Sequence, residues 1–237
     1  MKLSKLKSFC LIALIWFQVS DVCAGVVIGG TRVVFHGDKR EESLSVMNKG
    51  NKPFLIQSWV DTSGETGKKK GTVKPPFLIT PPLFRLDGGE DNLVRIIRTG
   101  ENFPEDRESV YWVNVKSIPS SVKGEKNVLQ IAIKNRIKLF YRPEGIKIPT
   151  EEDFESVSFH RSVEQIEVKN PTPYYITFYS MKLGNTDVST SHVMVPPKGS
   201  AYYHVPASIQ EDKVTWQYIN DFGGISESLV STTNKLN

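Results

Sequence analysis

The chain is dominated by short segments in which apolar and polar side chains alternate or apolar residues run together. A period of two residues places successive side chains on opposite faces of an extended strand, and the β-branched and aromatic residues in these segments favour strands. In the first half they are RVVFH, ESLSVMN, PFLIQSWVD, NLVRIIRT, ESVYWVNVKS and NVLQIAIKNRIKLFYRP. No segment keeps a helical period over three turns, so the chain is predicted to be all-β.

Turn-forming residues separate these segments at short intervals. Glycine permits positive φ angles, proline fixes φ, and asparagine and aspartate bond to their own backbone, so all four mark turns. They are concentrated in HGDKRE, NKGNKP, TSGETGKKKG, TPPLFRLDGGED and TGENFPED. About seven short strands with a turn every 8 to 12 residues or so are typical of an immunoglobulin-like β-sandwich, and we predict one here.

A second set of strand-like segments follows a stiff hinge, RPEGIKIPTEED. In this hinge Pro143 and Pro149 exclude a central strand, and the acidic residues 151–153 favour solvent. The segments after it are SVSFHR, VEQIEVKN, PYYITFYSM, SHVMVPP, AYYHVPA, KVTWQYIN and ISESLVS. With 237 residues and 39% hydrophobic content, the chain can fill two cores of about 100 residues each. We therefore predict two β-sandwich domains, at 25–145 and 150–237.

The first 24 residues have the organisation of a secretory signal peptide. A basic start, MKLSKLKS, precedes the apolar run FCLIALIWF, and VCA supplies the small residues of a cleavage site after Ala24. The apolar run is too short to span a bilayer comfortably. Cys10 and Cys23 both lie in this leader, so we expect an exported mature chain without a disulfide, stabilised by packing alone.

Charge and motifs exclude several classes of function. The formal net charge is only +4 and no long basic stripe is present, which argues against nucleic-acid binding. No P-loop, dinucleotide fingerprint or nucleophile elbow occurs, and GVVIGG at 25–30 precedes a strand instead of opening a helix. The histidines are far apart and no metal-ligand spacing links them: His36, His160, His192 and His204. We expect no metal and no cofactor.

Acidic pairs keep one enzymatic alternative open. They are Glu41/Glu42, Glu90/Asp91 and Glu105/Asp106. All lie in turn-like sequence, where solvation is the ordinary explanation. A carbohydrate-active enzyme would need two of these carboxylates to face one another across a cleft. We do not expect an enzyme.

The segment at 127–143 admits two interpretations. Leu129, Ile131 and Ile133 share one face of the predicted strand, while Gln130, Ala132 and Lys134 share the other. An ordinary half-buried strand of an antiparallel sheet has this pattern. The functional interpretation is an edge strand that offers its apolar row to a partner chain.

The strand-like segments, taken together, resemble the periplasmic chaperones of the chaperone–usher pilus pathway. The resemblance covers nearly all of the mature chain, in the order of the family. It is carried by TRVVF at 31–35, ITPPLFRLDGGEDNLVRI at 79–96, DRESVYWVNVKSIP at 106–119, NVLQIAIKNRIKLFYRP at 127–143, NPTPYYITF at 170–178 and YINDFGG at 218–224. Strand donation by these chaperones to pilins is a standard example of β-augmentation, and the family is placed among the immunoglobulin-like sandwiches.

The resemblance implies a boomerang of two domains and three sets of site residues. Leu129, Ile131 and Ile133 match the donor strand that enters the open groove of a pilus subunit. Arg32 and Lys138 match the pair that holds the subunit's C-terminal carboxylate. An interdomain salt-bridge set is matched by Glu108, Arg142 and Asp221. The short connection SSVKGEK resembles the subgroup that serves rod-like adhesive pili, whereas the C-terminal segment lacks the cysteines that some members have.

The implied function is ATP-independent capture of pilus subunits in the periplasm and their delivery to an outer-membrane usher. Neither ATP nor nucleic acid is an expected partner. Because a free donor edge invites pairing, a self-capping dimer is also expected. A structural pilus subunit or adhesion module with two immunoglobulin-like domains is the alternative from a different class.

Overall fold

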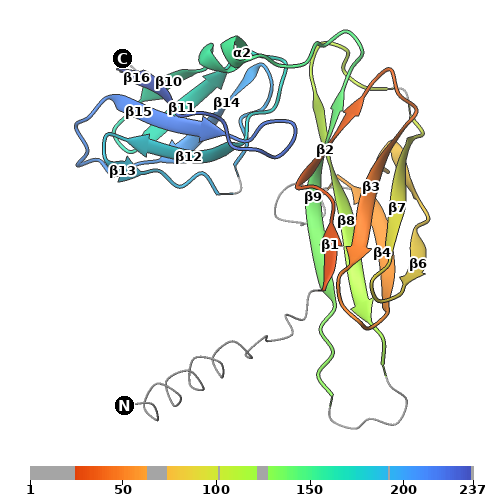
Figure 1. Ribbon diagram of the computed structural model, residues 1–237. Helices are drawn as coiled ribbons and strands as arrows, with labels where there is room; N and C mark the ends of the chain where they lie inside the picture. The colour runs from red at the N-terminus through yellow and green to blue at the C-terminus, as the bar shows by residue number, and fades with distance from the viewer. Residues whose placement is uncertain (1–24, 63–73, 101, 122–127, 192, 236–237) are drawn as a thin grey trace, which may run out of the picture.

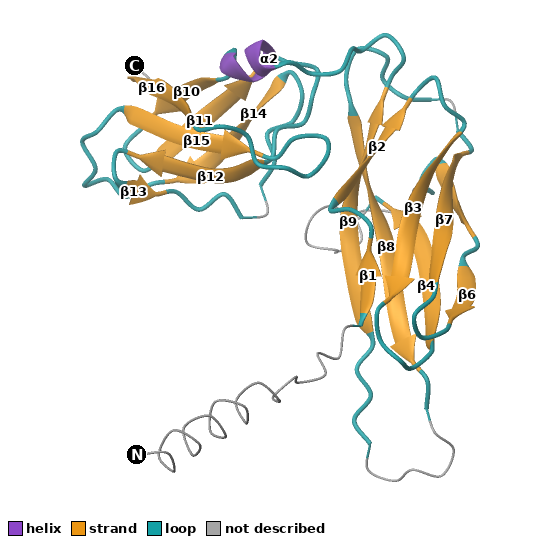
Figure 2. Cartoon of the chain, viewed as in Figure 1, coloured by secondary structure: helices purple, strands orange, loops and turns teal. Residues whose placement is uncertain are grey.

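The computed structural model describes residues 25–62, 74–100, 102–121, 128–191 and 193–235. It shows two β-sandwich domains set at an angle to one another and joined at one end of each (Figure 1). Strands make up nearly all of the regular structure (Figure 2), so the all-β prediction and the two sandwiches are confirmed. The predicted leader lies outside the described residues. Among the described residues no helix is long and apolar enough to cross a membrane.

The first domain packs a four-stranded sheet against a five-stranded sheet. The smaller sheet has the order β1 (Val26–Ile28), β3 (Glu41–Asn48), β7 (Asp91–Arg98) and β5 (Phe77–Thr80). The larger has the order β2 (Arg32–His36), β9 (Ile133–Arg142), β8 (Ser109–Pro119), β4 (Phe54–Asp61) and β6 (Leu83–Leu86). Alternate residues of both sheets fill the core between them, among them Phe35, Val46, Ile56, Val94 and Val113.

The second domain is one sheet of seven strands that curls on itself. Its order is β13 (Thr186–Asp187), β12 (Phe178–Leu183), β15 (Lys213–Tyr218), β16 (Leu229–Lys235), β10 (Ser158–Arg161), β11 (Gln165–Asn170) and β14 (Gly199–His204). Strand β16 joins the two halves, since it pairs antiparallel with β15 and parallel with β10. The rings of Phe159 and Trp216, one from each half, have centroids 5.6 Å apart in the core.

Several predicted boundaries were wrong for identifiable reasons. Strand β1 lies within the glycine-rich start and β6 within the segment assigned to a turn, because both are too short for a periodic pattern to show. The acidic residues at the end of the predicted hinge begin a short helix, α2 (Glu151–Glu155). The Thr150 N–H donates to the Asp153 carboxylate at 2.7 Å, so a cap replaces the expected solvated turn.

Strand β9 begins later than predicted. The pattern predicted a strand from residue 127, but regular pairing starts at Ile133, opposite Ser117 of β8. In this register only Ile118 and Pro119 of β8 remain to face Ala132 and Ile131, because β8 ends at Pro119, and the segment 128–132 forms no regular pairing. Leu129 and Ile131 therefore precede β9 instead of lying in it.

Candidate functional site

The apolar row predicted to bind a partner chain, Leu129, Ile131 and Ile133, is exposed. The exposed fractions are 84% for Leu129, 65% for Ile131 and 56% for Ile133. Residues of this type are ordinarily buried, and exposure of three at alternate positions of one segment is the pattern of an interaction site or an aggregation hazard. The half-buried alternative for this row is therefore wrong in the isolated chain.

Strand β9 also has a free backbone edge next to this row. Strand β2 pairs with β9 only over residues 138–142, in parallel register from Arg32 opposite Lys138 to His36 opposite Arg142. Within the part of the chain that the structure describes, residues 133–137 pair with β8 on one side only. A groove of about 470 Å³ lies between β1 and this half of β9. Its walls include Val26 and Ile28 on one side and Ile137 on the other.

Arg32 and Lys138 lie at the interface of the two domains, as neighbours across β2 and β9. The Arg32 Nη1 donates to the carbonyl of Ile219 at 2.9 Å, and the Lys138 Nζ donates to the hydroxyl of Thr177 at 3.3 Å. Both acceptors belong to the second domain. The two cations thus lie at the end of the free edge, where β2 begins to pair with β9. A ligand strand paired to β9 would end at this point.

The environment of Arg32 suits an anion. Its guanidinium lies over the ring of Phe140, 5.5 Å from the centroid, and its Nε is buried without a hydrogen-bond partner among the described residues. Burial lowers the pKa of Arg32, and the carboxylates of Asp221 and Glu108 oppose that shift. Because arginine stays protonated in proteins, the site keeps a buried cation with spare donor capacity.

Arg142 joins the domains through two carboxylates. Its guanidinium lies 2.8 Å from Glu108 of the first domain and 2.7 Å from Asp221 of the second. The other oxygen of Glu108 accepts the backbone N–H of Tyr175 at 2.8 Å. Burial raises the pKa of Glu108, and the Arg142 charge opposes the shift. The structure therefore brings Glu108, Arg142 and Asp221 together in one network.

Two further interdomain contacts had no signal in the sequence. Lys198 and Asp106 form an exposed ion pair at 2.8 Å, and Arg107 and Lys198 hold the pKa of Asp106 well below its ordinary value. Gly223 has a φ of 81°, and a Cβ at this position would collide with the hydroxyl of Thr31. Both contacts join loops far apart in sequence, so only the fold reveals them.

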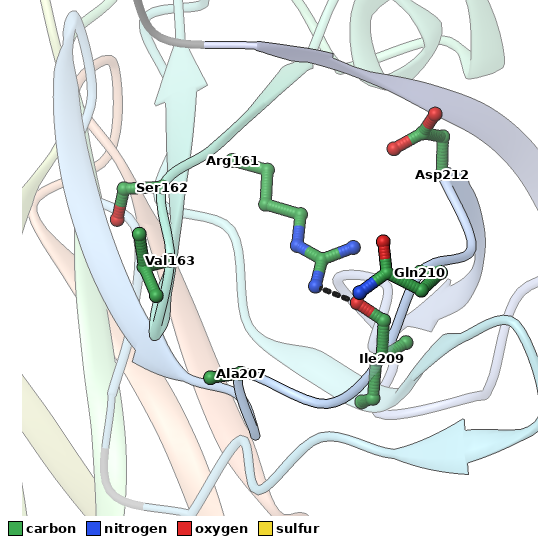
Figure 3. A pocket seen from close by; sticks show the side chains of 7 residues that line it. All are labelled: Arg161, Ser162, Val163, Ala207, Ile209, Gln210 and Asp212. Atoms are coloured by element: carbon green, nitrogen blue, oxygen red, sulfur yellow. Dashed lines mark hydrogen bonds between the residues drawn. The ribbon is translucent and has the colours of Figure 1, made fainter.

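A hollow in the second domain lies apart from these features. It has a volume of about 430 Å³ between the β10–β11 turn and the β14–β15 loop, and the Arg161 side chain crosses it (Figure 3). The guanidinium donates to the carbonyls of Ile209 and Glu211, so its charge is used to hold the loop. No group of side chains suited to a metal ion occurs within the described ranges.

Comparison with known proteins gives consistent matches over both domains. Residues 25–147 match the family described as pili and flagellar-assembly chaperone, PapD N-terminal domain, and residues 152–229 match the PapD C-terminal domain. The probable fimbrial chaperone LpfB of Escherichia coli O157:H7 is 40% identical over 237 residues, covering 98% of this chain and 99% of LpfB.

Solved structures of chaperones also match this chain over both domains. A structure of the Salmonella enterica SafA pilin in complex with the SafB chaperone matches with a TM-score of 0.78 and 32% identity, covering 90% of this chain and 98% of the matched chain. The periplasmic chaperone SfaE matches with a TM-score of 0.72 and 38% identity, covering 88% of this chain and 100% of SfaE.

Proposed function

The chain belongs to the PapD-like pilus assembly chaperones, and from that membership we propose that it captures pilus subunits by lending them an edge strand. The family consists of assembly chaperones and not of enzymes, so the carbohydrate-active alternative is wrong, and a structural pilus module is no longer favoured. The observation that carries the proposal is the free half of β9, preceded by an exposed apolar row and ended by two cations.

The physical logic of capture follows from the exposed row. A sandwich that lacks a strand exposes an apolar groove and unpaired backbone groups, both of which favour aggregation. Leu129, Ile131 and Ile133 would each contribute about 1.5–3 kcal/mol on burial in such a groove. Association itself costs on the order of 4–15 kcal/mol, so these contacts alone leave little margin. Ordering of 128–132 as a strand would accompany binding.

The pair Arg32 and Lys138 would supply the rest of the binding free energy and fix the register of the bound strand. A charge-assisted hydrogen bond contributes roughly 1.5–3 kcal/mol, and a C-terminal carboxylate between the two cations would make at least one. A slip of one residue would turn the apolar row out of the groove. The anchor would therefore select a chain terminus and align the strands.

The cellular setting is part of the same proposal. We propose that residues 1–24 are removed on export, that the chain works in the periplasm, and that an outer-membrane usher receives the captured subunit. We retain 25–145 and 150–237 as the domains, supported by family matches at 25–147 and 152–229. A free β9 edge further supports a self-capping dimer, which light scattering over a range of concentrations would detect and a monomer throughout would contradict.

Affinity capture tests the anchor. Tagged wild-type protein, Lys138→Ala and Arg32→Ala would be recovered from periplasm that co-expresses exported candidate subunits, and the retained proteins identified by mass spectrometry. The matched control is Lys134→Ala, which removes the same charge from the same face of β9 but at an exposed position away from the second domain. We expect loss of subunits in the two anchor variants only. Normal recovery with both variants would contradict the anchor.

A further inference from the structure

The anchor residues belong to a single row that crosses four neighbouring strands. Lys138 pairs with Arg32 across β2 and β9, and with Trp112 across β8 and β9. Trp112 in turn pairs with Asp61 across β4 and β8. Directly paired residues point to the same face of a sheet, with strands about 4.8 Å apart. Arg32, Lys138, Trp112 and Asp61 therefore form one line on the outer face of the larger sheet, over the adjacent β2, β9, β8 and β4 (Figure 1).

Trp112 is buried in an unusual way. Its exposed fraction is 6%, yet it belongs to neither hydrophobic core, because its neighbours Val113 and Val115 face the core and it faces outward. Cations cover its ring. The Arg136 guanidinium lies 4.5 Å from the ring centroid and the Lys138 Nζ lies 6.0 Å from it. An indole face attracts cations more strongly than the other aromatic rings do.

Polar contacts fix the surroundings of this ring. Arg136 forms an ion pair with Asp61 at 2.7 Å, and the Asn114 side-chain amide donates to the other oxygen of Asp61 at 2.9 Å. Asn114 is fully buried and pairs with Arg136 across β8 and β9. The ring is thus bordered by a hydrogen-bonded ion pair on one side and by the anchor lysine along the row.

We propose that Trp112 is the positioning residue of the carboxylate anchor. Lysine is a flexible cation on a four-carbon stem, and holding one such side chain in place costs rotamer entropy. The indole face and Thr177 restrict the Lys138 ammonium to the position beside Arg32 before any ligand arrives. This inference rests on the proposed function, because it assigns Trp112 a role in the carboxylate site of that function.

The test uses acetate as the probe and the Lys138 side chain as the reporter. NMR signals of the Lys138 methylene and ammonium groups, assigned by their loss in Lys138→Arg, would be followed in wild type, Trp112→Phe and Trp112→Leu. We expect an upfield ring-current displacement in the wild type that shrinks in that order. Titration with acetate against chloride at constant ionic strength should give affinities that fall about twofold and then about three- to tenfold.

Trp59→Leu is the matched control. Trp59 lies on the same outer face one strand away, pairs with Asn114, and has no cation over its ring among the described residues. We expect wild-type acetate affinity from this variant. If Trp112→Leu does not fold, the step from tryptophan to phenylalanine carries the test.

The outcomes separate the two claims. Equal acetate affinity in wild type and the Trp112 variants, with Lys138 responding in all of them, would overturn the role of Trp112 and leave the chaperone proposal intact. A wild-type Lys138 that does not respond to acetate would overturn the carboxylate site itself and Trp112 with it. A graded loss that Trp59→Leu does not share supports the inference.

Discussion

Strand β9 is one run of ten residues whose two halves lie in different surroundings. Residues 138–142 pair with β2, residues 138–141 also pair with β8, and Leu139 among them is completely buried. Residues 133–137 have only β8 beside them among the described strands, and Ile133 is more than half exposed. The alternation of side chains continues through both halves. An alternating pattern thus sets which face a side chain takes, while the neighbouring strands decide whether that face is buried.

The largest effect on stability is expected at the buried end of the strand, from Arg142→Ala. Removal of the Arg142 guanidinium leaves Glu108 buried without its cation. Breaking a buried ion pair in this way lowers the free energy of unfolding by about 3–5 kcal/mol. Urea denaturation followed by circular dichroism would measure the loss. The control is Arg85→Ala, because Arg85 and Asp87 form a similarly short but exposed pair at 2.7 Å, whose loss should leave the denaturation curve almost unchanged. Similar small losses from both variants would contradict the difference between the two surroundings.

The second prediction compares one substitution type in both halves. Leu139→Ala leaves a cavity in a closed core and should lower the free energy of unfolding by about 2–5 kcal/mol. Ile133→Ala removes a side chain that solvent already reaches, so a change within about 0.5 kcal/mol is expected. Denaturation curves of the two variants would decide. A large loss from Ile133→Ala would show that the free half is part of the core.

The smallest effect on stability, with the largest on capture, is expected from Ile131→Asp. A charge on an exposed residue does not disturb folding, but it cannot enter an apolar groove without a large desolvation cost. Circular dichroism should match the wild type while subunit recovery is lost. Ala132→Asp, one residue away on the other face of the predicted strand, is the control. Unfolding of Ile131→Asp would show that the row supports the fold of the isolated chain and would contradict a role confined to partner binding.

Much of the fold could be predicted because most strands are long enough to show their period. Strands β3, β4, β7 and β8 were all found in this way. The four-residue strands β5 and β6 were not predicted, since four residues beside prolines are too few to distinguish an alternating strand from a loop. The start of β9 was placed too early, because its pairing with β8 stops at Ile133 opposite Ser117, and the alternating pattern continues past that point without any sign of the change.

The site residues could be named from family resemblance, but the side chains that surround them could be identified only from the register of the paired strands. Lys138 lies opposite Trp112, and this pairing places the indole ring next to the Lys138 ammonium. No spacing in the sequence gives that pairing. The same holds for Thr177 and for the carbonyl of Ile219, which reach the anchor only because the second domain meets the first at this point. Contacts between loops, such as Lys198 with Asp106, depend on the interdomain angle.

Hydrogen exchange of the complex with a captured subunit tests the central claim most directly, namely that the free half of β9 is where a subunit's strand pairs. Peptides covering 128–137 would be compared with and without the subunit, and peptides covering β5, on the opposite sheet, would serve as the internal reference. The account predicts that exchange slows strongly over 128–137 and is unchanged over β5. Exchange that stays rapid over 128–137 in the complex, with protection elsewhere on the first domain, would contradict it.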